Sequence, residues 1–432
     1  MQDLERIKEL LLKEKVDTII LKKFSINESM VKFVNNKIVK TGIESTSSVE
    51  VFVSKDKRIV MTSIKEFDEE SIKKTISKLK NFLQYSQPNK NFVNIPENKY
   101  TYKEIKDIYD PKVENLDEVD VVESTINAAL KNSSRVSGTF EKSYGKLSIL
   151  TSTGIKQEDK SSSLYLSVRA LKTKEASGHK TATSRVLSKF NPEQIGKEAG
   201  EIAKLSLNPK EGIAGKYDVI FSPLAFAPIL ENIGSATSIF NVESGMSFFQ
   251  DKLGKKLGDF ELIDDGNLEN GAGSLKFDSE GYPTQKTNIT QNGILKTYLH
   301  NNSSAQRYKT KSTGNAGIIS PHPHNLVLDG EKGNVFDVKN GLYITNTWYT
   351  RFQNYTTGDF STIPRDGMFL IKNGVISEPV KNLRVSDNIL NLLKNIRLFG
   401  KEKEQITSWE ADTPCIMAPI LIKEVNITKP TN

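Results

Sequence analysis

Hydrophobic positions recur at helical spacing at the start of the chain and alternate with polar positions soon after it. Leucine and isoleucine at positions 4, 7, 10, 11 and 12 stand between charged residues, which predicts an amphipathic helix. A second helix is expected from Asp68, because aspartate is a favoured N-cap and an apolar stripe follows it. Alternating or β-branched runs predict strands between these helices, at 17–24, 30–39, 48–53 and 58–62.

The same order of elements returns later in the chain. A helix is expected at 116–130, and a closing helix begins at Asn191 and Pro192, a favoured pair at helix starts. Three runs between them predict strands, at 146–150, 163–171 and 181–187. The repeated helix–strands–helix order predicts a duplication. It divides this half of the chain into a first α+β unit at 1–84, a linker or extended arm at 85–112, and a second unit at 113–212.

Glycine and proline become frequent in the second half of the chain, which favours short strands and tight turns. We expect helices at 223–236 and 388–396, and a hairpin at Asn373-Gly374. Further runs predict strands, at 217–221, 288–300, 326–328, 342–347, 368–371, 375–376 and 416–425. The chain is therefore expected to be an α+β protein whose C-terminal domain, residues 213–432, is strand-rich and barrel- or sandwich-like.

Charge and composition argue against several classes of protein. Lys and Arg number 60 against 53 Asp and Glu, which leaves a formal charge of +7 with the signs well mixed. Because no block of basic residues is present, direct nucleic-acid binding is not expected. No apolar stretch is long enough to span a bilayer, and no signal-peptide core follows the first residues. We therefore expect a cytoplasmic protein with no membrane partner.

Few residues could form a metal site or a nucleophilic centre. The sequence contains no phosphate-binding loop and no Gly-x-Ser-x-Gly elbow. His322 and His324 stand two residues apart, where an extended segment would turn both toward one metal, but the flanking prolines also favour a plain stiff loop. Cys415, the single cysteine, precedes an apolar run and is interpreted as a buried structural thiol rather than a nucleophile.

An aromatic cluster at 348–355 is the densest in the chain. It combines Trp348 and Tyr349 with Arg351 and Asn354. Aromatic faces beside arginine and amide donors suit an extended peptide backbone, because they offer apolar contact and hydrogen bonds together. A packed edge strand would explain the same residues.

Four segments resemble the TldD/PmbA family, historically called modulators of DNA gyrase and related to zinc metallopeptidases. They are 217–236, 277–284, 292–301 and 312–316. The second is similar to the family's Asp-x-Glu-Gly-x-Pro-Thr motif, and the third to its Asn-Gly-Val-Leu-Lys-x-Tyr/Phe-Leu-His-Asn strand. The resemblance covers essentially the whole chain and implies an α+β fold with a duplicated N-terminal region.

The sequence departs from the family where TldD-type members bind zinc. Their helix after the first strand of the C-terminal domain carries His-Glu-x-x-x-His, and a cysteine near the C-terminus is the third ligand. The resemblance places Leu230 and Ser235 at the two histidine positions, and Glu231 at the glutamate. Cys415 lies in the neighbourhood of the family's cysteine. Leucine has no donor atom and serine is a poor zinc ligand. We therefore expect no metal and no catalytic residue in this chain, with Glu231 vestigial.

This pattern is similar to that of the PmbA (TldE-like) branch, and implies a non-catalytic subunit that shapes a chamber or holds extended peptides. Zinc is then expected in a TldD-type partner, and this chain would associate with that partner or with itself. Two alternatives stay open. One is a homodimeric metallopeptidase with a remodelled site, and the other a module that binds peptides or DNA gyrase. Substrate contact is expected at 348–355, with His300 and Asn301 as a second choice. The remodelled site would draw on His300, His322, His324 and Cys415.

Overall fold

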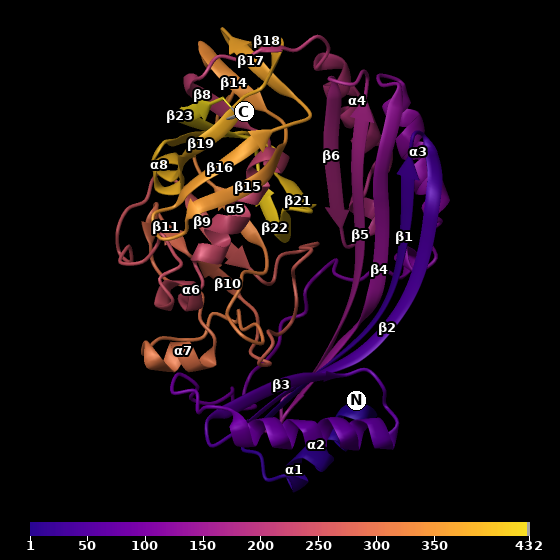
Figure 1. Cartoon of the computed structure of the whole chain (residues 1–432), viewed down its shortest axis with the longest axis vertical. Coiled ribbons are helices and arrows are strands. Elements are labelled where there is room, and N and C mark those ends of the chain that lie inside the picture. Colours follow the sequence, from indigo (N-terminus) through magenta and orange to yellow (C-terminus); the bar gives the residue numbers. More distant parts are fainter. Residues whose placement is uncertain (430–432) are drawn as a thin grey trace.

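The structure is a computed structural model that describes residues 1–429. Its N-terminal part is built on one long antiparallel sheet with the strand order β3-β2-β1-β4-β5-β6 (Figure 1). The helices and strands of this part are α1 (Gln2–Lys13), β1 (Thr18–Val34), β2 (Lys37–Lys55), β3 (Arg58–Ile64), α2 (Glu69–Tyr85), α3 (Glu118–Leu130), β4 (Arg135–Thr151), β5 (Lys156–Leu171), β6 (Ser177–Ser184) and α4 (Pro192–Leu205).

The sheet has the symmetry expected of a duplication. Each unit runs helix, three strands, helix, and the strand order reads outward from a central β1–β4 pair. The two central strands are both 17 residues long and pair antiparallel from Ile20 opposite Thr151 to Phe33 opposite Gly138. Because these strands belong to different units, the two units share one sheet rather than forming separate ones.

Two separate cores lie at opposite ends of this sheet. At one end α1 and α2 pack through residues such as Leu4 and Ile76 on β1, β2 and β3. At the other end α3 and α4 cover Phe140 and Leu166. Burial of each apolar helix face stabilises its end of the sheet. The predicted N-caps are confirmed, since the side chain of Asp68 accepts a hydrogen bond from the Ser71 N–H and α4 begins after Asn191 in the same way.

The expected strand at 30–39 is wrong. Asn35 and Asn36 have positive φ angles of 50° and 67° and turn the chain between β1 and β2. Asparagine tolerates this left-handed conformation better than most residues do, and two such residues in succession form a tight hairpin turn. Apolar residues stand on both sides of the turn, and they led to the prediction of one strand across it.

The C-terminal domain combines a ten-stranded sheet with a five-stranded sheet. Figure 1 shows this domain beside the long N-terminal sheet, with α5 among its strands. Its helices and strands are β7 (Lys210–Glu211), β8 (Gly215–Phe221), α5 (Pro223–Ala236), α6 (Ile239–Glu243), β9 (Glu261–Asp265), β10 (Lys286–Asn288), β11 (Thr290–Gln291), β12 (Ile294–Leu295), α7 (Asn302–Arg307), β13 (Leu326–Asp329), β14 (Asn340–Ile344), β15 (Thr347–Asn354), β16 (Asp359–Pro364), β17 (Met368–Lys372), β18 (Val375–Lys381), β19 (Arg384–Asn388), α8 (Ile389–Lys394), β20 (Ile396–Phe399), β21 (Glu404–Ser408), β22 (Ala411–Met417) and β23 (Ile420–Thr428). The α+β class with a strand-rich C-terminal domain is therefore confirmed.

Three expected strands of this domain are interrupted. The run 288–300 contains the end of β10 and the short strands β11 and β12, and Asn292 and Gly293 adopt positive φ angles and make a turn between the last two. The run 342–347 is divided between β14 and β15, and 416–425 between β22 and β23. The hairpin at Asn373-Gly374 is confirmed, with both residues at positive φ.

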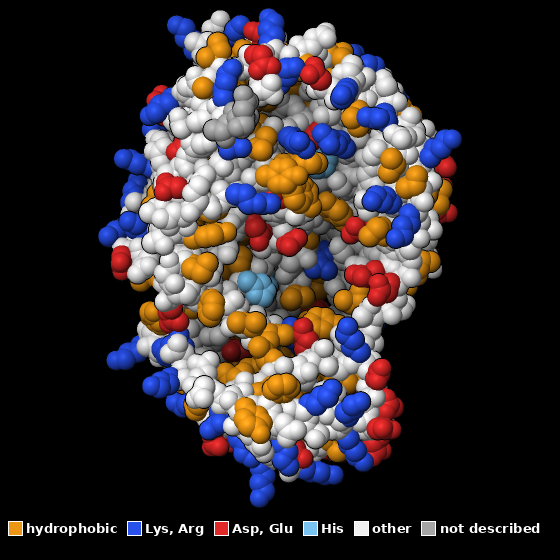
Figure 2. Space-filling view, viewed as in Figure 1, with side chains coloured by type: hydrophobic (Ala, Val, Ile, Leu, Met, Phe, Trp, Pro, Cys, Tyr) orange, Lys and Arg blue, Asp and Glu red, His pale blue; other side chains and the backbone are white. Residues whose placement is uncertain are grey.

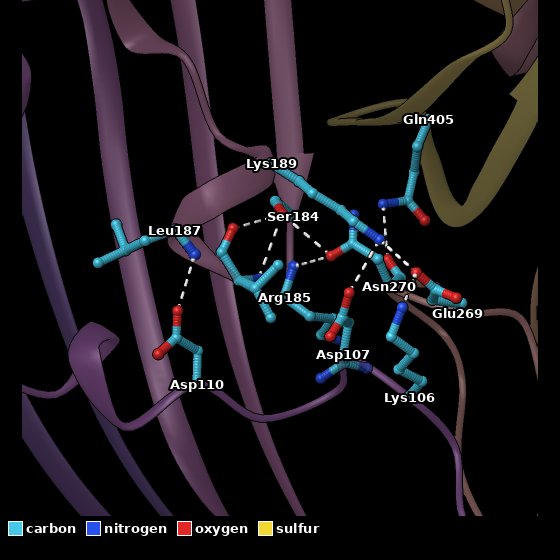
Figure 3. A network of polar contacts seen from close by, with 11 residues as sticks. Lys106, Asp107, Asp110, Ser184, Arg185, Leu187, Lys189, Glu269, Asn270 and Gln405 are labelled. Carbon is cyan, nitrogen blue, oxygen red and sulfur yellow. Dashed lines mark hydrogen bonds and ion pairs between the residues drawn. The ribbon is translucent and has the colours of Figure 1, made fainter.

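Polar contacts join the N-terminal sheet, the segment 86–110 and the C-terminal domain (Figure 3). Asn270 Oδ1 accepts hydrogen bonds from Ser184 Oγ at 3.0 Å and from the Arg185 N–H at 2.8 Å. Nearby, Lys189 Nζ lies 2.9 Å from Asp107 and 2.6 Å from Glu269. These contacts bring residues from three separate parts of the sequence into one network. No helix within residues 1–429 is long and apolar enough to cross a membrane.

Candidate functional site

Helix α5 contains the segment that the family resemblance aligns with the zinc motif of TldD-type members. It begins directly after β8, where the Ser222 side chain accepts a hydrogen bond from the Ala225 N–H and Pro223 takes the first helical turn. Most of its residues are buried, in the core between the two sheets of the domain. A helix enclosed in this way presents its side chains to fixed neighbours, so each position has a defined environment.

The two positions that correspond to zinc ligands face different environments. Leu230 is fully buried and belongs to the main hydrophobic core. Ser235 is exposed, and its Oγ accepts a hydrogen bond from Asn241 Nδ2 at 3.2 Å. The leucine offers a hydrocarbon and the serine is already engaged at the surface. The residues present at these positions therefore do not fit a zinc ion.

Glu231 is held by one residue of β22. The Thr413 N–H donates to Glu231 Oε2 at 2.8 Å, and Thr413 Oγ1 donates to Oε1 at 3.0 Å. Burial raises the pKa of the Glu231 carboxyl, while the bonds from Thr413 oppose that shift. Both carboxylate oxygens have protein partners, as in a structural contact between a helix and a strand.

Cys415 lies two residues after Thr413 on the same strand and faces α5. Its Sγ is 3.6 Å from the carbonyl oxygen of Ala227, and the side chain is fully buried. Burial raises the pKa of the thiol well above its ordinary value, so the neutral thiol is favoured. The two segments that the resemblance singled out, α5 and β22, therefore lie against each other.

The histidines do not complete such a site. His300 is buried, and burial lowers its pKa to about 4. His322 and His324 have ring centroids 5.9 Å apart, and His324 Nε2 is 2.8 Å from the Gly314 carbonyl oxygen. Across residues 1–429, no three His, Cys, Asp or Glu side chains are grouped so as to hold a metal ion.

The predicted aromatic cluster lies at an edge of the ten-stranded sheet. Its strand, β15, is the first in the sheet order and pairs only with β16 on that path. The Trp348 ring packs against Trp409, with centroids 5.4 Å apart. The guanidinium groups of Arg365 and Arg169 lie 4.7 and 5.1 Å from the Trp348 centroid, at cation–π distance. The predicted cluster is therefore part of a larger group of aromatic and basic side chains.

Glu410 fixes the shape of this edge. Its carboxylate accepts hydrogen bonds from the N–H groups of Tyr349 and Thr350, each at 2.9 Å, and from Arg351 Nη1 at 3.0 Å. Tyr349 has a positive φ of 58°, and the pairing of β15 with β16 is irregular between Trp348 and Arg351. The bulge leaves the tyrosine ring half exposed. Asn354 accepts hydrogen bonds from the N–H groups of the turn that follows.

The second predicted pair, His300 and Asn301, lies apart from β15. Asn301 is the N-cap of α7 and accepts a hydrogen bond from the Ser304 N–H, while Ser304 Oγ accepts one from the Asn301 N–H. His300 Nδ1 is 3.2 Å from Ser304 Oγ. Both side chains thus have local structural partners, and Asn301 also borders a cavity described below.

Several residues that contact the aromatic cluster at 348–355 were not predicted from the sequence. Trp409 and Glu410 follow β21, and Arg169 comes from β5 of the N-terminal sheet. Neither segment shows a motif, and only the fold brings them to β15. The one available signal was Trp409 itself, the second of the two tryptophans.

Family models and relatives of known sequence match most of this chain. The PmbA/TldA metallopeptidase C-terminal domain matches residues 214–429, and the central domain of the same family matches residues 108–207. An uncharacterized protein of Methanocaldococcus jannaschii is 28% identical over 82% of this chain and 84% of its own length. A metalloprotease TldD homolog of Buchnera aphidicola is 33% identical over 48% of this chain, which spans 45% of that relative.

The crystal structure of TldE from Thermococcus kodakarensis has the same fold. It superimposes with a TM-score of 0.86 at 20% identity, over 99% of this chain and all of that one. The two matched domains together account for most of the residues described above. The chain therefore belongs to the PmbA/TldA metallopeptidase family.

Proposed function

We propose that this chain is the non-catalytic, PmbA/TldE-like subunit of a cytoplasmic peptide-cleaving complex whose zinc-bearing subunit is of the TldD type. The observation that carries the proposal is the environment of α5. Leu230 fills the core where a ligand would be needed, and Ser235 faces solvent. Without ligands at these positions, Glu231 has no metal-bound water from which to remove a proton.

The proposed role of this chain in the complex is to hold extended substrate. β15 is the first strand in its sheet order, and an edge strand can pair with a peptide of almost any sequence. Because Glu410 already accepts hydrogen bonds from the Tyr349 and Thr350 N–H groups, the proposed pairing excludes these two groups. Trp348, Tyr349 and Trp409 add apolar contact area beside it, and Arg351 is largely exposed. A surface that binds through the peptide backbone and through aromatic contacts suits unfolded or small peptides better than it suits one folded partner.

The middle of β2 favours association with another subunit. From Val39 to Ser47 every residue is exposed, so both faces of this strand segment are uncovered. Ile43 is 86% exposed and Val39 57%. β3 pairs only with residues 49–55 of β2, so within residues 1–429 the segment 39–47 has a strand partner on one side only, and an open edge with exposed apolar side chains favours burial by a partner. A TldD-type subunit or a second copy of this chain is the proposed occupant.

The test is reconstitution with a TldD-type subunit. This chain, the TldD-type subunit and their mixture are assayed for cleavage of an unfolded peptide, and each is analysed for zinc. We expect no stoichiometric zinc and no cleavage with this chain alone, and faster cleavage by the mixture than by the partner alone. Equal activity of the partner alone would reject the proposal, as would zinc and cleavage in the isolated chain.

A further inference from the structure

A cavity of about 510 Å³ lies between the N-terminal sheet and the C-terminal domain, away from α5 and β15. Figure 2 shows hydrophobic and charged side chains gathered in the hollow between the lower end of the molecule, where α1 and α2 lie in Figure 1, and the C-terminal domain. Its walls come from β1 to β3, the segment 89–92, the helices α6 and α7, and the loops at 279–280 and 317–321. The volume is that of a small-molecule site.

Much of the wall is apolar. Phe52 and Phe92 lie with ring centroids 5.7 Å apart, and the cavity is further lined by Met61, Phe240 and Ile319. Phe240 is 47% exposed and Ile319 70% exposed, so these two side chains leave apolar surface uncovered at the cavity. Such a wall favours the hydrocarbon part of a ligand.

Five ionisable side chains also line the cavity, and four of them form two pairs of opposite charge. Lys22 Nζ lies 3.3 Å from Glu50 Oε2. Arg307 donates two hydrogen bonds to the carboxylate of Glu243, the longer at 2.8 Å. The fifth group, Glu280, has no basic partner among residues 1–429.

Glu280 differs from the other four ionisable side chains because it has no partner of opposite charge among residues 1–429, and this favours a bound ligand. The residue is only 8% exposed. Within residues 1–429 its carboxylate accepts one hydrogen bond, from the Asn302 N–H to Oε2 at 2.9 Å. Burial, together with the nearby Asp278 carboxylate, raises the pKa of Glu280 to about 8. A buried carboxyl group with a free oxygen and no counterion is costly to ionise, and a cation within the cavity would remove that cost.

We propose that this cavity binds a primary ammonium group carried on an apolar moiety, with Glu280 as the counterion of the ammonium and the Phe52–Phe92–Phe240 wall around the apolar part. A hydrophobic amine and the N-terminus of a peptide that begins with an apolar residue share this chemistry. The inference goes beyond the proposed function, because it requires neither a TldD-type subunit nor the β15 edge. It is tested on the isolated full-length chain, so its failure leaves the reconstitution experiment unaffected.

Isothermal titration calorimetry at pH 7 with 2-phenylethylamine, an ammonium ion at this pH, tests the site. We expect saturable binding at one site, and binding at least about tenfold weaker for 2-phenylethanol, its neutral counterpart, because a charge-assisted hydrogen bond is lost. The tripeptide Phe-Gly-Gly separates the two sources of the ammonium group. Equal or tighter binding of the tripeptide identifies a peptide N-terminus, and weaker binding identifies a free amine. No binding of 2-phenylethylamine, or equal binding of the alcohol, overturns the proposal.

Variants separate the carboxyl group from the wall. Glu280→Gln keeps an oxygen for the Asn302 N–H but cannot carry a charge, and should weaken 2-phenylethylamine at least about tenfold with no effect on the alcohol. Phe240→Ala should weaken both ligands. Glu104→Gln is the matched control, since Glu104 is exposed and pairs with Lys276 outside the cavity. Thermal unfolding checks that each variant is folded. If Glu280→Gln does not fold, the ligand pair and Phe240→Ala decide the question.

Proton release gives an independent readout. Near pH 7 Glu280 is mostly protonated in the free protein, given its raised pKa. Binding of an ammonium ion should ionise it and release close to one proton, seen as a binding heat that depends on the ionisation heat of the buffer. The other ionisable groups around it are Lys22, Glu50, Glu243, Arg307 and Asp278. Glu280→Gln should abolish the release. An undiminished release in this variant would assign the proton elsewhere and overturn the role of Glu280.

Discussion

Glu231 on α5 receives both hydrogen bonds of Thr413 on β22, one from the backbone and one from the hydroxyl. In a peptidase of the His-Glu-x-x-x-His type, the glutamate must leave its carboxylate available to a metal-bound water. Here the same position ties a helix to a strand. The residue at the glutamate position of the motif thus makes a contact between α5 and β22 in this chain.

This contact predicts a structural effect for Glu231→Gln. An amide presents a donor where Thr413 also donates, so one hydrogen bond is lost and the free energy of unfolding should fall by about 1–3 kcal/mol. Urea unfolding measures the loss. Thr413→Val, which removes only the hydroxyl, should cost less. Peptide cleavage by the complex should be unchanged, and a large loss of activity in a Glu231→Gln protein of normal stability would contradict the structural role.

The two former ligand positions should respond differently to substitution. Leu230→Ala removes a fully buried side chain and is expected to lower the free energy of unfolding by about 2–5 kcal/mol. Ser235→Ala, at the surface, should change it by less than about 0.5 kcal/mol. Denaturant unfolding of both variants provides the comparison. A double Leu230→His, Ser235→His variant should gain no stoichiometric zinc, because its two imidazoles would face the core and the solvent respectively.

Arg351 should affect substrate and not folding. Its side chain is 63% exposed, and Glu410, although only 5% exposed, keeps its hydrogen bonds from the Tyr349 and Thr350 N–H groups when Arg351 is removed. We expect Arg351→Ala to raise the KM of the reconstituted complex for an unfolded peptide and to leave the melting temperature nearly unchanged. Arg397→Ala, an exposed arginine on β20, serves as the control. Equal KM values for the two variants would remove Arg351 from the binding surface.

The raised pKa of Glu280 predicts a pH dependence of stability. Its ordinary value is 4.5 and its value in the folded protein is about 8, so between these limits the folded state holds a proton that the unfolded chain has released. The contribution of this group is therefore fully present below about pH 4.5 and is lost as the pH rises to about 8. Chemical unfolding across this range should show a flatter profile for Glu280→Gln than for the unmodified chain.

Asp366 should hold the N-terminal sheet to the C-terminal domain. Its buried carboxylate lies 2.7 Å from Arg169 Nε and 2.6 Å from Ser177 Oγ, both on the N-terminal sheet, and 3.1 Å from Asn346 Nδ2. Asp366→Ala leaves these donors without an acceptor and should cost at least about 2 kcal/mol. Compared with the unmodified chain, the amide hydrogen exchange rate should rise more in β6 than in β8. Unchanged protection of β6 would show that other contacts suffice.

Local signals in the sequence predicted local structure well. Asp68, Asn191 and the Asn373-Gly374 turn were identified because a cap or a tight turn depends on a few neighbouring residues. The turns at 35–36 and 292–293 were missed even though they use the same residue types, because an apolar pattern continues on both sides of each turn. At 35–36 the flanking Val34 and Val39 are themselves exposed, so apolar residues there indicate neither burial nor a continuous strand.

The candidate site was predictable only in part, for a different reason. The 348–355 cluster is contiguous in sequence, but Trp409, Glu410 and Arg169 reach it from other segments through the pairing of strands. The cavity at Glu280 joins β1 to β3 with residues more than two hundred positions away. The motif that includes Glu280 marked the segment, whereas the missing counterion could be seen only once its neighbours were in place.

The pairing of β1 with β4 has a consequence for biosynthesis. When the first repeat leaves the ribosome, β1 can pair with β2, but its other edge has no strand until residues 135–151 have been translated. For that interval the nascent chain presents a row of open backbone groups, the kind of edge that joins other chains and recruits chaperones. The strand that joins the two units in the finished protein therefore has an unpaired edge during this part of translation.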